Sequence, residues 1–111
     1  MPDNGCCKIA SEGSSTKVLF TEQILGNQPE LQDAFARIES LIGELSEPDM
    51  VFDLGGVTYV ASVVVAWFFD FAKKIKTKSG RMRIVNANEP IVQSFVVTRL
   101  HKVCEVEGAA S

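Results

Sequence analysis

The chain has 111 residues, of which 46% are hydrophobic and 23% charged, a composition typical of one soluble globular domain with a modest core. Its formal net charge of −3 excludes the global basic field that draws proteins to nucleic acid. The longest uninterrupted apolar run, Val63 to Phe69, is only 7 residues, whereas a membrane-spanning helix needs ~20. The first 16 residues are polar and lack the apolar region of a signal peptide, so we expect a cytoplasmic protein without a membrane span.

The N-terminal region, residues 1–16, is rich in glycine, serine and polar residues, and we predict a flexible segment there. A short edge strand over Cys7 to Ala10 is left open. The three cysteines, Cys6, Cys7 and Cys104, have neither the CxxC spacing of a redox pair nor the Cys/His spacing of a zinc site. We therefore expect reduced thiols, with Cys104 as a small core residue.

The first clear elements are a strand over Lys17 to Thr21 and a helix that begins near Pro29. Asn27 is the predicted N-cap, and Glu30 completes an N-x-x-E capping box with it. The helix has the strongest 3.6-residue periodicity in the chain, with an apolar stripe formed by Leu31, Phe35, Ile38, Leu41 or Ile42, and Leu45.

The central stretch, Met50 to Ile75, predicts a strand, a connection and a helix. The β-rich apolar run at its start is followed by Gly55-Gly56, as expected for a strand buried on both faces. The part from Ser62 has room for about 4 helical turns. Its apolar residues Val64, Phe68, Phe71 and Ile75 share one face.

The C-terminal third predicts one more strand, a helix and a final strand. Gly80 is expected to stop the preceding helix with a positive φ. A strand follows over Arg81 to Asn86, then a helix over Ile91 to Leu100 and a strand over Val103 to Val106. Alternating strands and helices predict an α/β fold with a sheet of four to five mostly parallel strands and helices mainly on one face. We assign the domain to residues 17–107 and a tail to 108–111.

One local basic cluster stands out against the acidic background, and we interpret it as a solvated helix end, where cations complement the helix dipole. Its members are Lys73, Lys74, Lys76, Lys78, Arg81 and Arg83.

No enzyme signature is present, and we expect neither catalysis nor a cofactor or metal. His101 is the only histidine, and no serine lies in a G-x-S-x-G elbow. A P-loop is absent, and Gly55-Gly56 lacks the G-x-G-x-x-G spacing of a dinucleotide site. The acidic residues form no pair suited to glycosidase or metal chemistry.

Ser62 can be interpreted in two ways. As an N-cap, its Oγ would accept a hydrogen bond from a backbone N–H one turn on. As a phosphorylation site, it would carry about 1.5 to 2 negative charges beside a helix N-terminus, which changes the charge of any docking surface there.

The stretch Val51 to Ser62, VFDLGGVTYVAS, resembles the STAS-domain pattern of a hydrophobic strand followed by D-L-S-G-V-x-[FY]-[IV]-D-S-S-G. Three further segments are similar to the family over about Lys17 to Val106: Ser79 to Arg81, Val85-Asn86, and Leu100 to Val106, which matches the ending L-x-x-[LV]-F-x-[VI]. The family includes bacterial anti-sigma factor antagonists and the tails of sulfate transporters.

The resemblance implies a small α/β domain whose exposed helix end docks a protein partner, often a serine kinase with anti-sigma activity. Phosphorylation of the serine after the motif's aspartate switches that docking, and this position falls on Ser62. The motif's aspartate falls on Ala61, its second serine on Val63 and its glycine on Val64. The two β-branched valines make this helix start bulkier and more apolar than the family pattern.

Three functional hypotheses follow. The first is a phospho-regulated anti-sigma factor antagonist in transcriptional signalling, and the second is a STAS module that docks its partner without phosphorylation, in a transport or signalling complex. The third is a small nucleotide- or anion-binding domain that uses Gly55-Gly56 and the helix end. A dimer through an exposed apolar strand edge is left open. The candidate partner-binding residues are Thr58, Tyr59, Ala61, Ser62, Val63 and Val64.

Overall fold

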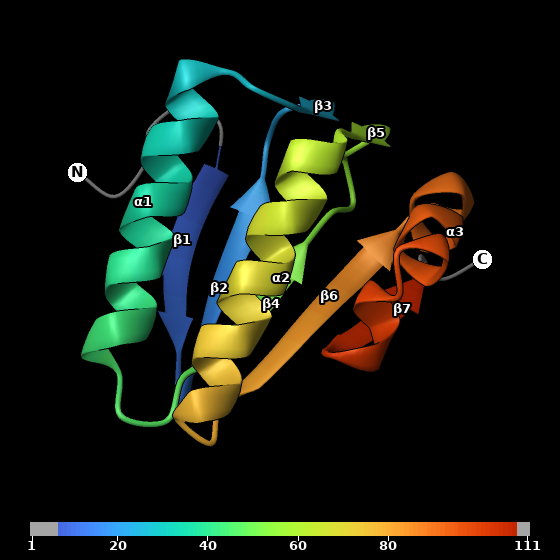
Figure 1. The fold of residues 1–111 in the computed structure, drawn as a ribbon. Helices are drawn as coiled ribbons and strands as arrows, with labels where there is room; N and C mark the ends of the chain where they lie inside the picture. Colours follow the sequence, from blue (N-terminus) through green and yellow to red (C-terminus); the bar gives the residue numbers. More distant parts are fainter. Residues whose placement is uncertain (1–6, 109–111) are drawn as a thin grey trace.

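A five-stranded sheet runs through the molecule in the order β1-β2-β4-β6-β7, and a separate two-stranded sheet joins β3 to β5. The computed structural model describes residues 7–108 (Figure 1). Only β1 is antiparallel to its neighbour; every other pairing is parallel. In chain order the elements are β1 (Cys7–Glu12), β2 (Ser15–Phe20), β3 (Ile24–Leu25), α1 (Pro29–Glu44), β4 (Asp49–Asp53), β5 (Tyr59–Val60), α2 (Ser62–Thr77), β6 (Arg81–Ala87), α3 (Glu89–Val97), the 3₁₀ helix η1 (Leu100–Lys102) and β7 (Glu105–Gly108).

All three α-helices pack on the same face of the five-stranded sheet, which confirms the predicted fold class (Figure 1). The core lies between this face and the helices. Phenylalanine rings dominate it: Phe52 of β4 stacks on Phe71 of α2 at a centroid distance of 5.9 Å, and Phe68 meets Phe95 of α3 edge-on at 6.1 Å. Such pairs stabilise beyond the area that they bury.

The other face of the sheet has no helix over it among residues 7–108. Cross-strand ion pairs occupy it instead: Lys17 lies 3.5 Å from Asp53, Arg83 lies 3.4 Å from Asp49, and Arg81 binds Glu105 through two hydrogen bonds. The Glu105 carboxylate accepts these bonds, and the pKa of Glu105 is lowered as a result. Opposite charges on neighbouring strands, here at diagonal positions, stabilise a sheet and make this part of the face polar.

The N-terminal segment is more ordered than we predicted. The edge strand left open over Cys7–Ala10 exists as β1 and extends to Glu12, where a turn at Gly13 leads into β2. The prediction of a flexible segment is therefore wrong for residues 7–16, because Cys7 buries its side chain in the core and the strand completes a ladder with β2. Residues 1–6, with Cys6, and 109–111 of the tail lie outside the described residues.

The start of α1 differs from the expected cap, whereas α3 is capped by a side chain. The N-cap of α1 is Gln28, not Asn27, and its side chain makes no capping bond. The Asn27 side chain instead accepts a 2.7 Å hydrogen bond from Gln32. At α3 the side chain of Asn88 does cap, accepting a 3.0 Å bond from the Ile91 N–H.

Helix α3 is shorter than predicted. It ends at Val97, two residues before Arg99, which has a left-handed φ of 67°. The chain then makes η1, which carries the exposed His101, and enters β7 at Glu105 rather than at Val103. An apolar run alone does not mark this break, because the helical stretch and the turn both contain buried side chains.

Candidate functional site

The small sheet of β3 and β5 supports the start of α2. Ile24 pairs with Tyr59 and Leu25 with Val60. Thr58 strengthens the junction, since its N–H and its hydroxyl both donate to the Gln23 carbonyl, at 2.7 and 3.1 Å. Leu25 and Val60 point into the core, whereas Ile24 and Tyr59 are 54% and 58% exposed. Two large apolar side chains therefore stand next to each other at the surface.

Ser62 is the first residue of α2 and is exposed. The N-cap is Ala61, in an extended conformation, so the predicted capping role of Ser62 is wrong by one residue. The Ala61 N–H donates to the Leu25 carbonyl at 2.8 Å, which continues the β3–β5 pairing and delays the helix by one residue. Alanine has no side-chain acceptor, and no side-chain cap closes this end of α2.

The electrostatic environment of this helix start favours an anion. The first N–H groups of a helix have no intrahelical acceptor and carry the positive end of the helix dipole. Here the Ala61 carbonyl accepts from Val64 and Val65, the first amides that bond within the turn. The first turn also contains no acidic residue. A negative group at Ser62 would therefore meet donors without a competing carboxylate.

The two valines that follow have different environments. Val63 is 39% exposed, whereas Val64 is fully buried in the core. Of the two valines among the candidate partner-binding residues, only Val63 therefore reaches the surface, because successive helical residues are about 100° apart around the axis and only one of them faces out. We use the name α2 N-terminal surface for the exposed or half-exposed residues at this end: Ile24, Thr58, Tyr59, Ala61, Ser62 and Val63.

A hollow of about 200 Å³ borders the α2 N-terminal surface on the side of α3. Its walls come from β5 and from the first turns of α3. Asn88, the N-cap of α3, holds this helix near the segment before β5 by donating to the Val57 carbonyl at 3.2 Å. Sequence reasoning missed this hollow and also Ile24, because β3 is only two residues long and has no periodicity to detect. The lining residues are Thr58, Tyr59, Val60, Pro90, Ile91 and Ser94.

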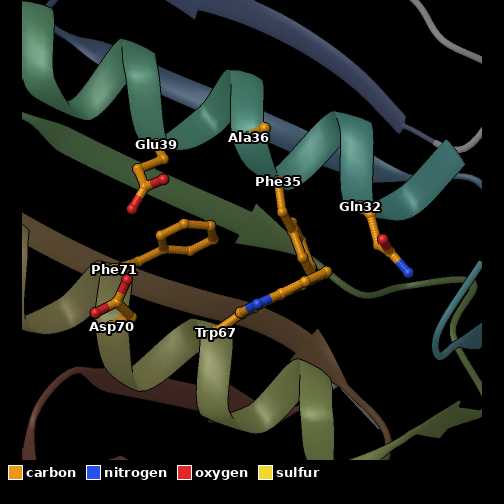
Figure 2. Close-up of a pocket in the computed structure, with 7 residues that line it drawn as sticks. All are labelled: Gln32, Phe35, Ala36, Glu39, Trp67, Asp70 and Phe71. Atoms are coloured by element: carbon orange, nitrogen blue, oxygen red, sulfur yellow. The ribbon is translucent and has the colours of Figure 1, made fainter. Parts of the chain in front are cut away.

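A second hollow, of about 160 Å³, lies between α1 and α2 (Figure 2). The rings of Phe35 and Trp67 form its floor, meeting edge-on at 4.5 Å. Lys74 binds Glu39 and Asp70 on its rim, and these hydrogen bonds raise the pKa of Lys74. Because the carboxylates already have a cationic partner, we interpret this hollow as part of the α1–α2 packing.

In the glycine pair after β4, the Gly55 amide already has a hydrogen-bond acceptor within the protein. The Gly55 N–H donates to Asp53 Oδ1 at 2.9 Å, and Asn86 donates to the same oxygen at 3.2 Å. A phosphate at Gly55 would have to displace this carboxylate and would be repelled by it. The geometry therefore does not favour the anion-binding hypothesis at this position.

Other chemistry finds little support in the part of the chain that the structure describes. No group of three His, Cys, Asp or Glu side chains could hold a metal ion among residues 7–108. Burial raises the pKa of the Cys104 thiol to about 12, with a further contribution from Glu105, so this cysteine is protonated and unreactive at neutral pH. None of the described helices is long and apolar enough to cross a membrane.

Comparison with known families decides the classification, because the family model of the STAS domain matches residues 23–109. The chain belongs to the STAS domain family. The resemblance noted over about Lys17 to Val106 is therefore confirmed. Among curated proteins no significant match was found.

Solved structures agree on the STAS fold. An anti-sigma-factor antagonist (STAS) domain protein from Planctomyces limnophilus superposes with a TM-score of 0.78 at 16% identity, covering 94% of this chain and 91% of that one. A Thermotoga maritima protein provisionally named an anti-sigma factor antagonist gives a TM-score of 0.68 at 14% identity, covering 94% and 87%. At these identities the likeness establishes the fold.

Proposed function

We propose that this STAS domain is an anti-sigma factor antagonist-like regulatory protein of the cytoplasm. It docks a serine-kinase or anti-sigma partner through the α2 N-terminal surface, and phosphorylation of Ser62 controls the docking. The main support is the position of Ser62, whose exposed hydroxyl lies at an uncapped helix start beside exposed apolar side chains.

The chemistry of the surface explains why a phosphate there would act as a switch. The residues of the α2 N-terminal surface are all uncharged. Docking through Ile24, Tyr59 and Val63 would remove apolar area from water, which favours association. A phosphate on Ser62 adds about 1.5 to 2 negative charges to this neutral patch, and the docked partner would have to desolvate them. Phosphorylation is therefore expected to weaken docking.

Phosphorylation should also stabilise the free protein. The dianion would lie near the unpaired N–H groups of the first turn of α2, where the dipole favours negative charge. The switch would thus act on the docking surface while the folded domain stays intact.

The test is incubation with candidate serine kinases and ATP, followed by mass spectrometry and by a binding assay with the kinase partner. We expect the label on Ser62, and we expect Ser62→Asp to weaken binding by at least about tenfold, as for a charge desolvated in an interface. Ser46→Asp is the matched control, since Ser46 is exposed in the loop after α1, away from this surface. Label absent from Ser62 with every kinase tried would overturn the proposed switch.

A second candidate function is docking without phosphorylation, and the residues around Ser62 favour it. Ala61 stands where the family motif has an acid, and Val63 adds apolar area next to Tyr59. In this case Ser62 would stay unlabelled and incubation with kinase and ATP would leave partner binding unchanged, whereas Val63→Asp or Tyr59→Ser would abolish it. The two candidates therefore predict opposite results for the labelling of Ser62 and for partner binding before and after incubation with kinase and ATP.

A third candidate, binding of a nucleotide or a free anion, has weaker support because Asp53 occupies the Gly55 amide. If it were correct, phosphate or a nucleotide would raise the melting temperature in a saturable manner. A melting temperature independent of both ligands would remove it.

A further inference from the structure

Strand β1 is an open edge of the sheet. It pairs with β2 through a two-residue turn, with Glu12 opposite Ser15, and Gly13 at the turn has a φ of 67°, as in a type II′ hairpin. The pair that closes such a hairpin is hydrogen-bonded, and hydrogen-bonded pairs alternate with non-hydrogen-bonded pairs along the ladder. Ile9 and Ser11 are therefore in the second kind of pair, and their backbone N–H and C=O groups point away from β2 toward the open edge.

A hollow of about 360 Å³ lies along this edge, between β1 and α1. Its apolar part consists of Ile9 and Leu41, which are both half-buried, and Ile9 also packs against the core. Its lining residues are Ile9, Arg37, Ser40, Leu41 and Glu44. A strand added beside β1 would have its backbone groups satisfied by Ile9 and Ser11 and could place side chains in this hollow.

The charges on β1 are self-complementary. Lys8 and Glu12 lie two residues before and two residues after Ala10, on the sheet face without helices. A twofold axis perpendicular to the sheet near Ala10 would bring Lys8 of each copy opposite Glu12 of the other.

We propose that the partner of β1 is a second copy of this chain, paired antiparallel with Ala10 opposite Ala10. In this register Ile9 of one copy exchanges backbone hydrogen bonds with Ser11 of the other, and Lys8 faces Glu12. Centring the pair on Ile9 instead would set Lys8 against Ala10 and lose the ion pair. The opposite edge, β7, is shorter and carries Glu105 and Glu107 without a cation, so it lacks this self-complementarity.

The alternative is that Lys8 and Glu12 protect the edge from pairing, as charges on edge strands often do. A charge swap distinguishes the two. Association of the full chain is measured by analytical ultracentrifugation over a wide concentration range. We expect Lys8→Glu and Glu12→Lys each to raise the dimer dissociation constant about tenfold or more, since like charges would then face each other twice, and we expect the double variant to restore association.

Lys102→Glu and Glu107→Lys are the matched controls. They make the same charge changes at exposed positions in or just before β7, the strand at the opposite edge of the sheet from β1. They should leave association unchanged. A wild-type chain that stays monomeric at every concentration, or a double variant that associates no better than the single variants, would overturn the proposal.

A disulfide trap tests the register independently. In a non-hydrogen-bonded antiparallel pair the Cα atoms are about 4.5 Å apart, within the ~4.4–6.8 Å that a disulfide spans. In a background of Cys6→Ser, Cys7→Ala and Cys104→Ala, we expect Ala10→Cys to cross-link into a dimer under mild oxidation. Ser11→Cys, one residue along the same strand, should stay monomeric because it faces Ile9. Equal cross-linking of the two variants, or none, would overturn this register.

Discussion

The two ends of α2 are built in different ways. At its C-terminal end the carbonyls and the following turn are bound by several groups, whereas at its N-terminal end no side chain caps the helix. Figure 1 shows the two ends of α2 at opposite ends of the strands, with β3 and β5 beside the first turn. The C-terminal end is therefore bound to its neighbours in the fold, whereas the N-terminal end has backbone donors without a side-chain acceptor.

At the closed end, Lys78 connects two helices. Its Nζ donates to the carbonyls of Ile42, Gly43 and Leu45 at 3.0, 2.6 and 2.6 Å. Lys78, the C-cap residue of α2, therefore supplies hydrogen-bond donors to the C-terminus of α1. Lys74, Arg81 and Arg83 of the same basic cluster also bind acidic partners. The interpretation of the cluster as a solvated helix end applies to the exposed Lys73 and Lys76, and also to Lys74 and Arg81, whose ion-paired side chains are 43% and 55% exposed. It is wrong for Lys78 and Arg83, which are half-buried against their partners.

The turn after α2 also corrects an expectation. The residue with positive φ is Ser79, at 56°, and not Gly80. Gly80 is required for a different reason: a Cβ there would lie 2.2 Å from the Pro48 carbonyl oxygen. The close approach allows the Arg81 N–H to donate to that oxygen at 2.8 Å and aligns β6 with β4.

The largest effect should come from adding a Cβ at Gly80, where the Pro48 carbonyl oxygen leaves no room for one. Gly80→Ala is expected to reduce the free energy of unfolding by about 3 kcal/mol, since neither the Pro48 backbone nor the buried Ile75 can move without strain. Urea denaturation measures the loss. Gly43→Ala is the control, because a Cβ there meets nothing within 4 Å, and alanine in a helix should instead stabilise by about 0.5–1 kcal/mol. Equal effects of the two variants would contradict the close contact.

Removing the link between the helices should have the next largest effect. Lys78→Met keeps the aliphatic stem but leaves three carbonyls without their donor, and we expect a loss of about 2 kcal/mol. Lys76→Met is the control on the same turn, where the side chain is exposed, and should change the stability by less than about 0.5 kcal/mol. If both variants unfolded at the same urea concentration, the role of Lys78 would be disproved.

A side-chain cap at the N-terminus of α2 should stabilise the domain. Ala61→Asp supplies a side-chain acceptor at the N-cap and should raise the free energy of unfolding by about 1 kcal/mol. Ala66→Asp, at an exposed position within α2, should lower it by about 0.7 kcal/mol or more, because helix propensity falls and the new carboxylate lies one turn from Asp70. A destabilised Ala61→Asp variant would mean that this helix start has no free donors.

The smallest effect is expected from charge alone. Ser62→Asp should stabilise by about 0.5 kcal/mol at low ionic strength through the helix dipole, and the gain should fall as salt is added. Ser46→Asp, outside any helix, should show neither the gain nor its salt dependence. Thermal unfolding at two ionic strengths measures both variants, and a gain that does not respond to salt would contradict an electrostatic origin.

Sequence patterns predicted the elements that bury a long face. The stripe from Leu31 to Ile42 and the run from Val64 to Ile75 marked α1 and α2 well, because burial repeats with the helical period over several turns. They could not locate β3 or the exact start of α2. Those depend on backbone bonds between segments far apart in the sequence, from Thr58 to Gln23 and from Ala61 to Leu25, which are 35 and 36 positions apart.

The sequence by itself determined the α/β alternation, the family and the position of Ser62 near a helix start, since all three depend on local periodicity or a contiguous motif. Only the tertiary structure decided that Ala61, and not Ser62, occupies the N-cap position of α2, and that Ile24 lies beside Tyr59. These outcomes depend on how distant segments pack around one core, and local propensity carries no information about that contact.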